Sequence, residues 1–96
     1  MRNYEVAIIV NPDLDDQAVQ QLEEKVSNWI EAADGKAYDV ERWGRRRLAY
    51  PIDGNRDGYY LFFQTQMPPQ ASGMVERDLK LNEDILRFMI TLKEEV

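Results

Sequence analysis

The sequence predicts an α+β fold, a four-stranded antiparallel sheet with two helices on one face. Three observations favour this fold. Apolar and polar residues alternate weakly in residues 3–10 and again in residues 36–50. Two segments repeat apolar residues every three or four positions, and turn-forming residues separate the segments. The chain has 96 residues, which suffices for one domain spanning residues 1–96 and for one modest core.

The first strand is expected at residues 3–10, because Val, Ile and Tyr alternate with other residues there and Pro12 ends the run. A helix should follow, since apolar residues recur at spacings of three and four. Asp13 or Asp15 is expected to cap its start, and Gly35 to end it in a left-handed conformation.

The middle of the chain reads as a hairpin. Residues 36–50 form a long strand in which Gly44 predicts a bulge or twist, and Pro51 predicts a sheet edge or the end of the strand. Residues 53–58 are rich in turn formers and should be the hairpin loop. Residues 59–66 are largely aromatic or apolar and should be the second strand of the hairpin.

The last third predicts a second helix and a fourth strand. Pro68-Pro69 should open the helix, in which every fourth residue from Ala71 to Leu79 is apolar. A turn at residues 82–84 should lead into a strand at residues 85–93. The order is β-α-β-β-α-β, and right-handed crossovers place both helices on the same face of the sheet. This is the ferredoxin-like layout.

Strand alternation divides the sheet into a core face and an open face. The core face should hold Val6, Ile8, Leu61, Phe63, Phe88 and Ile90. The open face should hold Ala7, Ile9, Tyr60, Phe62, Gln64, Arg87 and Met89. Such an apolar and aromatic surface predicts a partner, because exposed apolar patches usually mark interaction sites.

The charge distribution is uneven. The formal charge is −6, and the four arginines between Arg42 and Arg47, with no acid among them, leave −10 for the rest of the chain. Guanidinium groups bind phosphate through paired hydrogen bonds, so this segment predicts contact with a nucleic-acid backbone. A solvated edge strand, whose charges prevent sheet-to-sheet aggregation, is the other interpretation that the arginines alone allow.

Composition excludes several classes of function. The chain has no cysteine and no histidine, so it lacks disulfides, thiolate metal sites and the usual general base. The stretch from Asp13 to Glu24 has acids spaced as in a calcium loop, but Ala18 stands where such loops need glycine. No metal, cofactor or catalytic residue is expected. Without a membrane-length apolar run or a signal-peptide stretch, we expect a soluble, cytoplasmic protein.

The aromatic strand allows two interpretations. Its rings could stack on bases, as in RNA-recognition domains of this layout, or could dock a protein. Asp57 stands where the RNA-recognition signature has a basic residue. We favour protein docking, because an acidic chain repels phosphate over a wide face.

Four stretches resemble a known family: Met1-Arg2-Asn3-Tyr4-Glu5 through Asn11-Pro12, Gly44-Arg45-Arg46-Arg47-Leu48-Ala49-Tyr50-Pro51-Ile52, Gly58-Tyr59-Tyr60, and Ile85-Leu86-Arg87-Phe88-Met89. Together they are similar to the sixth protein of the bacterial small ribosomal subunit, from residue 1 to about residue 93. The resemblance implies a ferredoxin-like fold and no enzymatic activity. It also implies binding to the central domain of small-subunit ribosomal RNA, as a heterodimer with the eighteenth small-subunit protein.

On this basis the arginines expected at the RNA are Arg2, Arg45, Arg46, Arg47 and Arg87. The residues expected at the partner protein are Tyr4, Tyr50, Tyr60, Phe62 and Met89. For Tyr4 and Tyr50 a role as rings that anchor the core is equally open. A second hypothesis is a regulatory module of the same fold that homodimerises through the open face and binds a small ligand between protomers. A stable homodimer without RNA would favour that hypothesis.

Overall fold

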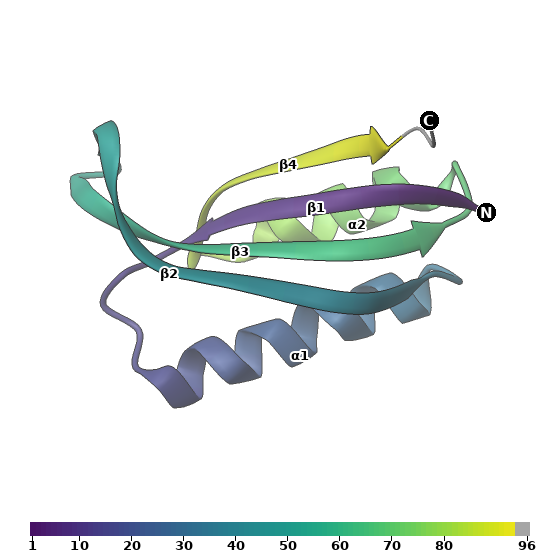
Figure 1. Ribbon diagram of the computed structural model, residues 1–96, viewed down its shortest axis with the longest axis horizontal. Coiled ribbons are helices and arrows are strands. Elements are labelled where there is room, and N and C mark those ends of the chain that lie inside the picture. The colour runs from purple at the N-terminus through teal and green to yellow at the C-terminus, as the bar shows by residue number, and fades with distance from the viewer. Residues whose placement is uncertain (94–96) are drawn as a thin grey trace.

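The computed structural model describes residues 1–93. Its elements are β1 (Arg2–Val10), α1 (Asp16–Ala32), β2 (Lys36–Ile52), β3 (Asn55–Met67), α2 (Ala71–Leu81) and β4 (Ile85–Lys93). The strands form one antiparallel sheet in the order β2-β3-β1-β4, and both helices pack on one side of it (Figure 1). The predicted α+β, ferredoxin-like fold is confirmed.

The core lies between the helices and the sheet. Val6 and Ile8 of β1 face it together with Leu61 and Phe63 of β3, and all four side chains are at most 1% exposed. On β4, Phe88 and Ile90 are partly buried and pack against the same cluster. The helices contribute buried residues at helical spacings: Val19, Leu22, Val26, Ile30, Ala71, Val75 and Leu79. The predicted core face is therefore confirmed.

The two ends of α1 decide which residue caps its start and correct the prediction for the residue that ends it. Of the two candidates, Asp15 is the cap, since its carboxylate accepts a hydrogen bond from the amide of Ala18 at 2.8 Å. At the other end Asp34, with φ 65°, takes the left-handed conformation that we expected of Gly35. Gly35 is needed for another reason. A Cβ there would lie 2.6 Å from Cγ of Met67, so only glycine allows this approach of helix end and sheet.

The β2–β3 hairpin is longer than predicted. Its turn is only Asp53-Gly54, both with positive φ, which suits a two-residue hairpin turn. Residues 55–58, which we expected in the loop, belong to β3, because pairing with β2 overrides their turn-forming composition. Gly44 sits at a register shift with φ 75°, which confirms the predicted bulge. Pro51 lies in an edge strand, as expected.

Candidate functional site

The three consecutive arginines of β2 do not share one environment. Arg45 pairs with Tyr59 of β3, Arg46 with Gly58 and Arg47 with Asp57. Successive strand residues point to opposite faces, so Arg46 is directed to the open face and its two neighbours to the other side. The run therefore offers three separate guanidinium groups in different surroundings.

Arg45 anchors the edge strand. Its Nη2 donates a hydrogen bond to the carbonyl oxygen of Pro12, in the loop between β1 and α1. This contact connects β2 to a segment 33 positions earlier in the chain. Arg45 is thus partly committed to the fold, although its side chain remains exposed.

Arg46 stacks on an aromatic row of the open face. Its guanidinium carbon lies 5.5 Å from the ring centroid of Trp43, a cation–π arrangement, and its Nε donates to the Trp43 carbonyl oxygen at 3.4 Å. The Trp43 ring centroid lies 4.6 Å from that of Phe62, which in turn lies 6.4 Å from that of Tyr60. Trp43 is 51% exposed, so the row is accessible. We had not placed Trp43 among the site residues; it follows Arg42, which faces α1, so strand alternation turns it to the open face.

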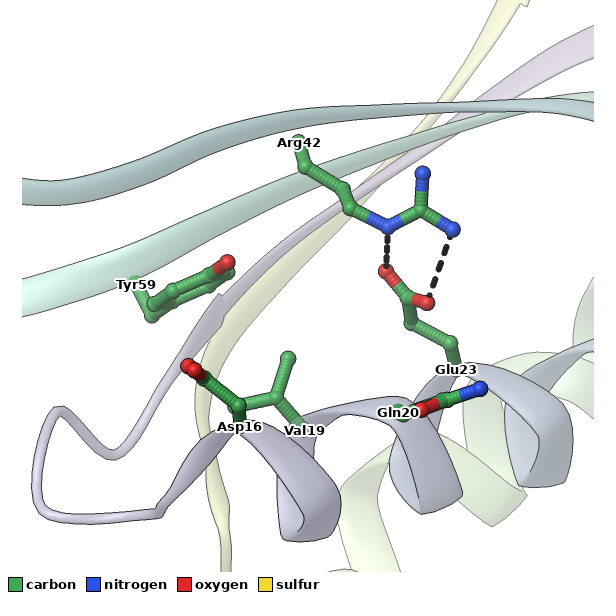
Figure 2. A pocket seen from close by; sticks show the side chains of 6 residues that line it. All are labelled: Asp16, Val19, Gln20, Glu23, Arg42 and Tyr59. Carbon is green, nitrogen blue, oxygen red and sulfur yellow. Dashed lines mark hydrogen bonds and ion pairs between the residues drawn. The ribbon is translucent and has the colours of Figure 1, made fainter.

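The fourth arginine of the segment, Arg42, is structural. Figure 2 shows it reaching from β2 toward Glu23 of α1, with Nε 2.6 Å from Oε1 and Nη2 3.0 Å from Oε2. The hydrogen bonds and the charge of Glu23 raise the pKa of Arg42. Sequence reasoning missed this pair. The available signal was an acid, Glu23, inside the apolar stripe of the helix between Leu22 and Val26.

A shallow hollow of about 320 Å³ lies beside this ion pair, lined by Asp16, Val19, Gln20, Glu23, Arg42 and Tyr59 (Figure 2). It offers no nucleophile paired with a base. Within residues 1–93 no group of acids is arranged to hold a metal ion. Nor is any helix of that part of the chain long and apolar enough to cross a membrane.

The open face is hollowed and mainly apolar. Strand pairing sets two rows across it: Tyr60 beside Ile9 beside Arg87, and Phe62 beside Ala7 beside Met89. These six residues line a hollow of about 300 Å³, together with Glu5, Ile8, Phe88 and Thr91. Met89 is 66% exposed, and the rings of Tyr60 and Phe62 are partly exposed. The expected open-face set is thus brought together on one surface.

The two ends of the open face differ in charge. Arg46 and Arg87 lie on the two edge strands toward one end. Glu41 pairs with Phe62, and Glu5 and Asp39 both pair with Gln64, so strand alternation places three carboxylates on this face toward the other end. Gln64, expected on the open face, lies there but is buried, and its amide donates a hydrogen bond to Glu5 at 2.8 Å.

Glu5 is held in its charged form. The hydrogen bond from Gln64 lowers the pKa of Glu5, and the ammonium of Lys93, 3.1 Å from Oε2, lowers it further. Partial burial of the carboxylate acts in the opposite direction but does not prevail. The open face therefore keeps the Glu5–Lys93 ion pair beside its apolar hollow.

Three of the expected site residues lie elsewhere. Tyr4 is 9% exposed and belongs to the core, so the core interpretation of this ring holds and we drop it from the partner surface. Arg2 begins β1, opposite Met67, and at about 3.4 Å per residue it lies roughly 25 Å from the arginine run. Tyr50 is 62% exposed and lies near the closed end of the hairpin, not among the open-face rings.

Comparison with known proteins gives consistent matches. The family described as Ribosomal protein S6 matches residues 3–91. The Small ribosomal subunit protein bS6 of Moorella thermoacetica is 37% identical over 95 residues, covering 99% of this chain and 97% of that protein. Its counterpart of the same name from Streptomyces griseus is 41% identical over 94 residues, covering 98% of each.

A solved structure agrees with the fold. The crystal structure of 30S ribosomal protein S6 from Thermotoga maritima matches with a TM-score of 0.91 at 28% identity, covering 96% of this chain and 87% of that one. These matches confirm the resemblance seen in four stretches of the sequence. The chain belongs to the ribosomal protein S6 family, whose members are structural proteins of the small ribosomal subunit and not enzymes.

Proposed function

We propose that this chain is a structural component of the bacterial small ribosomal subunit, in the cytoplasm, that binds the central domain of the ribosomal RNA as a heterodimer with the eighteenth small-subunit protein. The observation that carries the proposal is the open face, where an apolar and aromatic hollow lies beside two arginines. Arg87 forms no ion pair within residues 1–93, and Arg46 stacks on Trp43. Relatives named as small-subunit proteins support the setting.

The partner is assigned to the hollow of the open face. Tyr60, Phe62 and Met89 supply an apolar centre, which a partner covers with its own apolar side chains. The carboxylates of Asp39 and Glu41 lie at one end of this face, so cations of the partner are attracted there. A basic partner fits both features.

The RNA is assigned to the arginine end. Arg46 and Arg87 flank the open face at that end, and Arg47 follows at the hairpin. The rest of the chain is acidic and opposes a polyanion, so a basic partner supplies further phosphate contacts. This division of roles explains how a chain of formal charge −6 functions in a ribonucleoprotein.

Size-exclusion chromatography and subunit sedimentation test the proposal. The purified chain mixed with the eighteenth small-subunit protein should elute as a one-to-one heterodimer, and a tagged chain in cells should sediment with small subunits. A Tyr60→Ala, Phe62→Ala variant should lose the heterodimer, whereas a Met74→Ala variant, which alters an exposed residue of α2, should keep it. A stable homodimer that stays out of the small-subunit fractions would favour the regulatory module instead.

A further inference from the structure

The closed end of the β2–β3 hairpin carries a cluster of exposed side chains outside the open-face hollow. Figure 1 shows this end curling away from the sheet on the side opposite α1. Arg47, Tyr50 and Arg56 line a hollow of about 180 Å³ there, with Leu48, Ala49 and Pro51. Within residues 1–93 neither Arg47 nor Arg56 forms an ion pair or side-chain hydrogen bond. Both guanidinium groups are therefore available to an anion.

The sequence fixes the shape of this end. Arg47 pairs with Asp57 and Ile52 with Asn55, so residues 48–51 bulge opposite Arg56 alone. A bulge of this kind bends a strand and redirects its side chains. Pro51 restricts the backbone further, and the two-residue turn at Asp53-Gly54 closes the hairpin. The cluster is consequently presented on a constrained backbone.

Leu48 secures the bulge to the sheet. Its side chain is 9% exposed and lies over Gly58, where an added Cβ would be 3.3 Å from its Cδ2 and 2.3 Å from Cγ2 of Ile9. The absence of a side chain at Gly58 thus makes room chiefly for Ile9 and, beside it, for Leu48. With Leu48 held inward, Tyr50 projects outward and is 62% exposed.

The chemistry of the cluster fits an unpaired nucleotide in an RNA strand. An exposed tyrosine ring is a stacking surface for a base, and guanidinium groups bind the adjoining phosphates. Residues 45–56 contain four arginines and one acid, so a basic protein would be repelled here. A hollow of about 180 Å³ is smaller than the roughly 300–1,000 Å³ of small-molecule pockets, which favours one segment of a polymer over a free nucleotide.

We infer that Tyr50 stacks on one unpaired base of the ribosomal RNA while Arg47 and Arg56 bind its phosphates. This inference rests on the proposed function and assigns Tyr50 to the RNA instead of the partner protein. It also adds Arg56, which the sequence analysis placed in the hairpin loop and not at the RNA. The site is separate from the open face, where the partner is placed.

The test uses the heterodimer and a transcript of the central domain of small-subunit ribosomal RNA, with affinity measured at several salt concentrations. Tyr50→Leu should weaken RNA binding roughly 5- to 150-fold without changing the salt slope, because stacking carries no charge. Tyr50→Phe should stay within about twofold, since the ring is kept. Arg47→Gln and Arg56→Gln should each lower the salt slope by roughly one.

Two matched controls isolate the site. Tyr38→Leu removes another exposed tyrosine of β2, at its other end, and Arg77→Gln removes an exposed arginine of α2; neither should change RNA affinity. If Tyr50→Leu binds RNA like the unmodified heterodimer, or if it disrupts the heterodimer before RNA is added, the inference is overturned while the proposed function stands. If the unmodified heterodimer fails to bind the transcript, both are overturned.

Discussion

Glu23 of α1 and Arg42 of β2 form a two-point ion pair, with Nε 2.6 Å from Oε1 and Nη2 3.0 Å from Oε2 (Figure 2). The carboxylate is buried and the guanidinium is more than half exposed. The pair connects the outermost strand of the sheet to the first helix. It thereby helps to position the strand that carries the rest of the arginine segment.

The first prediction concerns this pair. Arg42→Met should lower the free energy of unfolding by about 1–2 kcal/mol, because it leaves a buried carboxylate without its partner while solvent screens part of the lost attraction. Lys80→Met is the control. It breaks the exposed pair with Glu76 on α2 and should change stability by less than about 0.5 kcal/mol. Denaturant unfolding measures both variants. If Arg42→Met and Lys80→Met lowered the free energy of unfolding equally, the Arg42–Glu23 pair would be only a surface contact.

The second prediction concerns the pH dependence of stability. The pKa of Glu5 is lowered in the folded chain, chiefly by Gln64 and then by Lys93. A group with a lowered folded-state pKa stabilises the fold fully above its unfolded value, here 4.5, and loses that effect as the pH falls through the folded value. The advantage of the unmodified chain over Glu5→Gln should therefore shrink below pH 4.5.

Denaturant unfolding of both proteins at neutral and acidic pH measures this difference. Gln64→Leu should shrink the same pH-dependent difference, since it removes the largest cause of the shift. A difference between unmodified chain and Glu5→Gln that is constant down to acidic pH would contradict the account.

The third prediction uses two neighbouring rings of β3 on opposite faces. Phe63 is fully buried, so Phe63→Ala should cost about 3–5 kcal/mol of stability. Phe62 is partly exposed on the open face, so Phe62→Ala should cost only about 1–2 kcal/mol while weakening the heterodimer. Denaturant unfolding of both variants measures the loss of stability, and titration with the partner protein measures the loss of heterodimer affinity. A larger loss of stability for Phe62→Ala would reverse the assignment of the two faces.

The fourth prediction separates the three consecutive arginines. Arg45→Gln should lose about 0.5–1.5 kcal/mol of stability, because its hydrogen bond to the Pro12 carbonyl is broken. Arg46→Gln and Arg47→Gln should leave stability nearly unchanged and should each lower the salt slope of RNA binding by heterodimer by roughly one. Unchanged salt slopes for both would mean that the run is a solvated edge, as the alternative reading of the sequence held.

The sequence predicted most of the fold because its signals were local. The strand at residues 85–93 matches β4 at both ends, and the apolar spacing of both helices matches their buried faces. The two faces of the sheet followed from alternation alone. What escaped prediction depends on contacts between distant segments. From the sequence Gly35 is expected to be a helix cap, and only the structure shows that it allows the close approach of Met67. Residues 55–58 are expected to be a loop, and only the structure shows that they pair with β2.

The candidate site was predictable only as a set of surfaces. Tyr60, Phe62, Arg87 and Met89 come together as strand alternation implied. The arginines could not be sorted from sequence, because the roles of Arg42 and Arg45 depend on Glu23 and Pro12, which lie far away in the chain. Tyr4 and Tyr50 are both tyrosines on strands, and only burial separates a core ring from an exposed one.

RNA binding by the chain alone and by the heterodimer, at one fixed salt concentration, tests the central claim most directly. The probe is a transcript of the central domain of small-subunit ribosomal RNA. The account predicts weak binding by the chain alone, because its formal charge of −6 opposes a polyanion, and much tighter binding once the eighteenth small-subunit protein is added. If the chain alone bound the transcript as tightly as the heterodimer does, the division of roles between the two proteins would be contradicted.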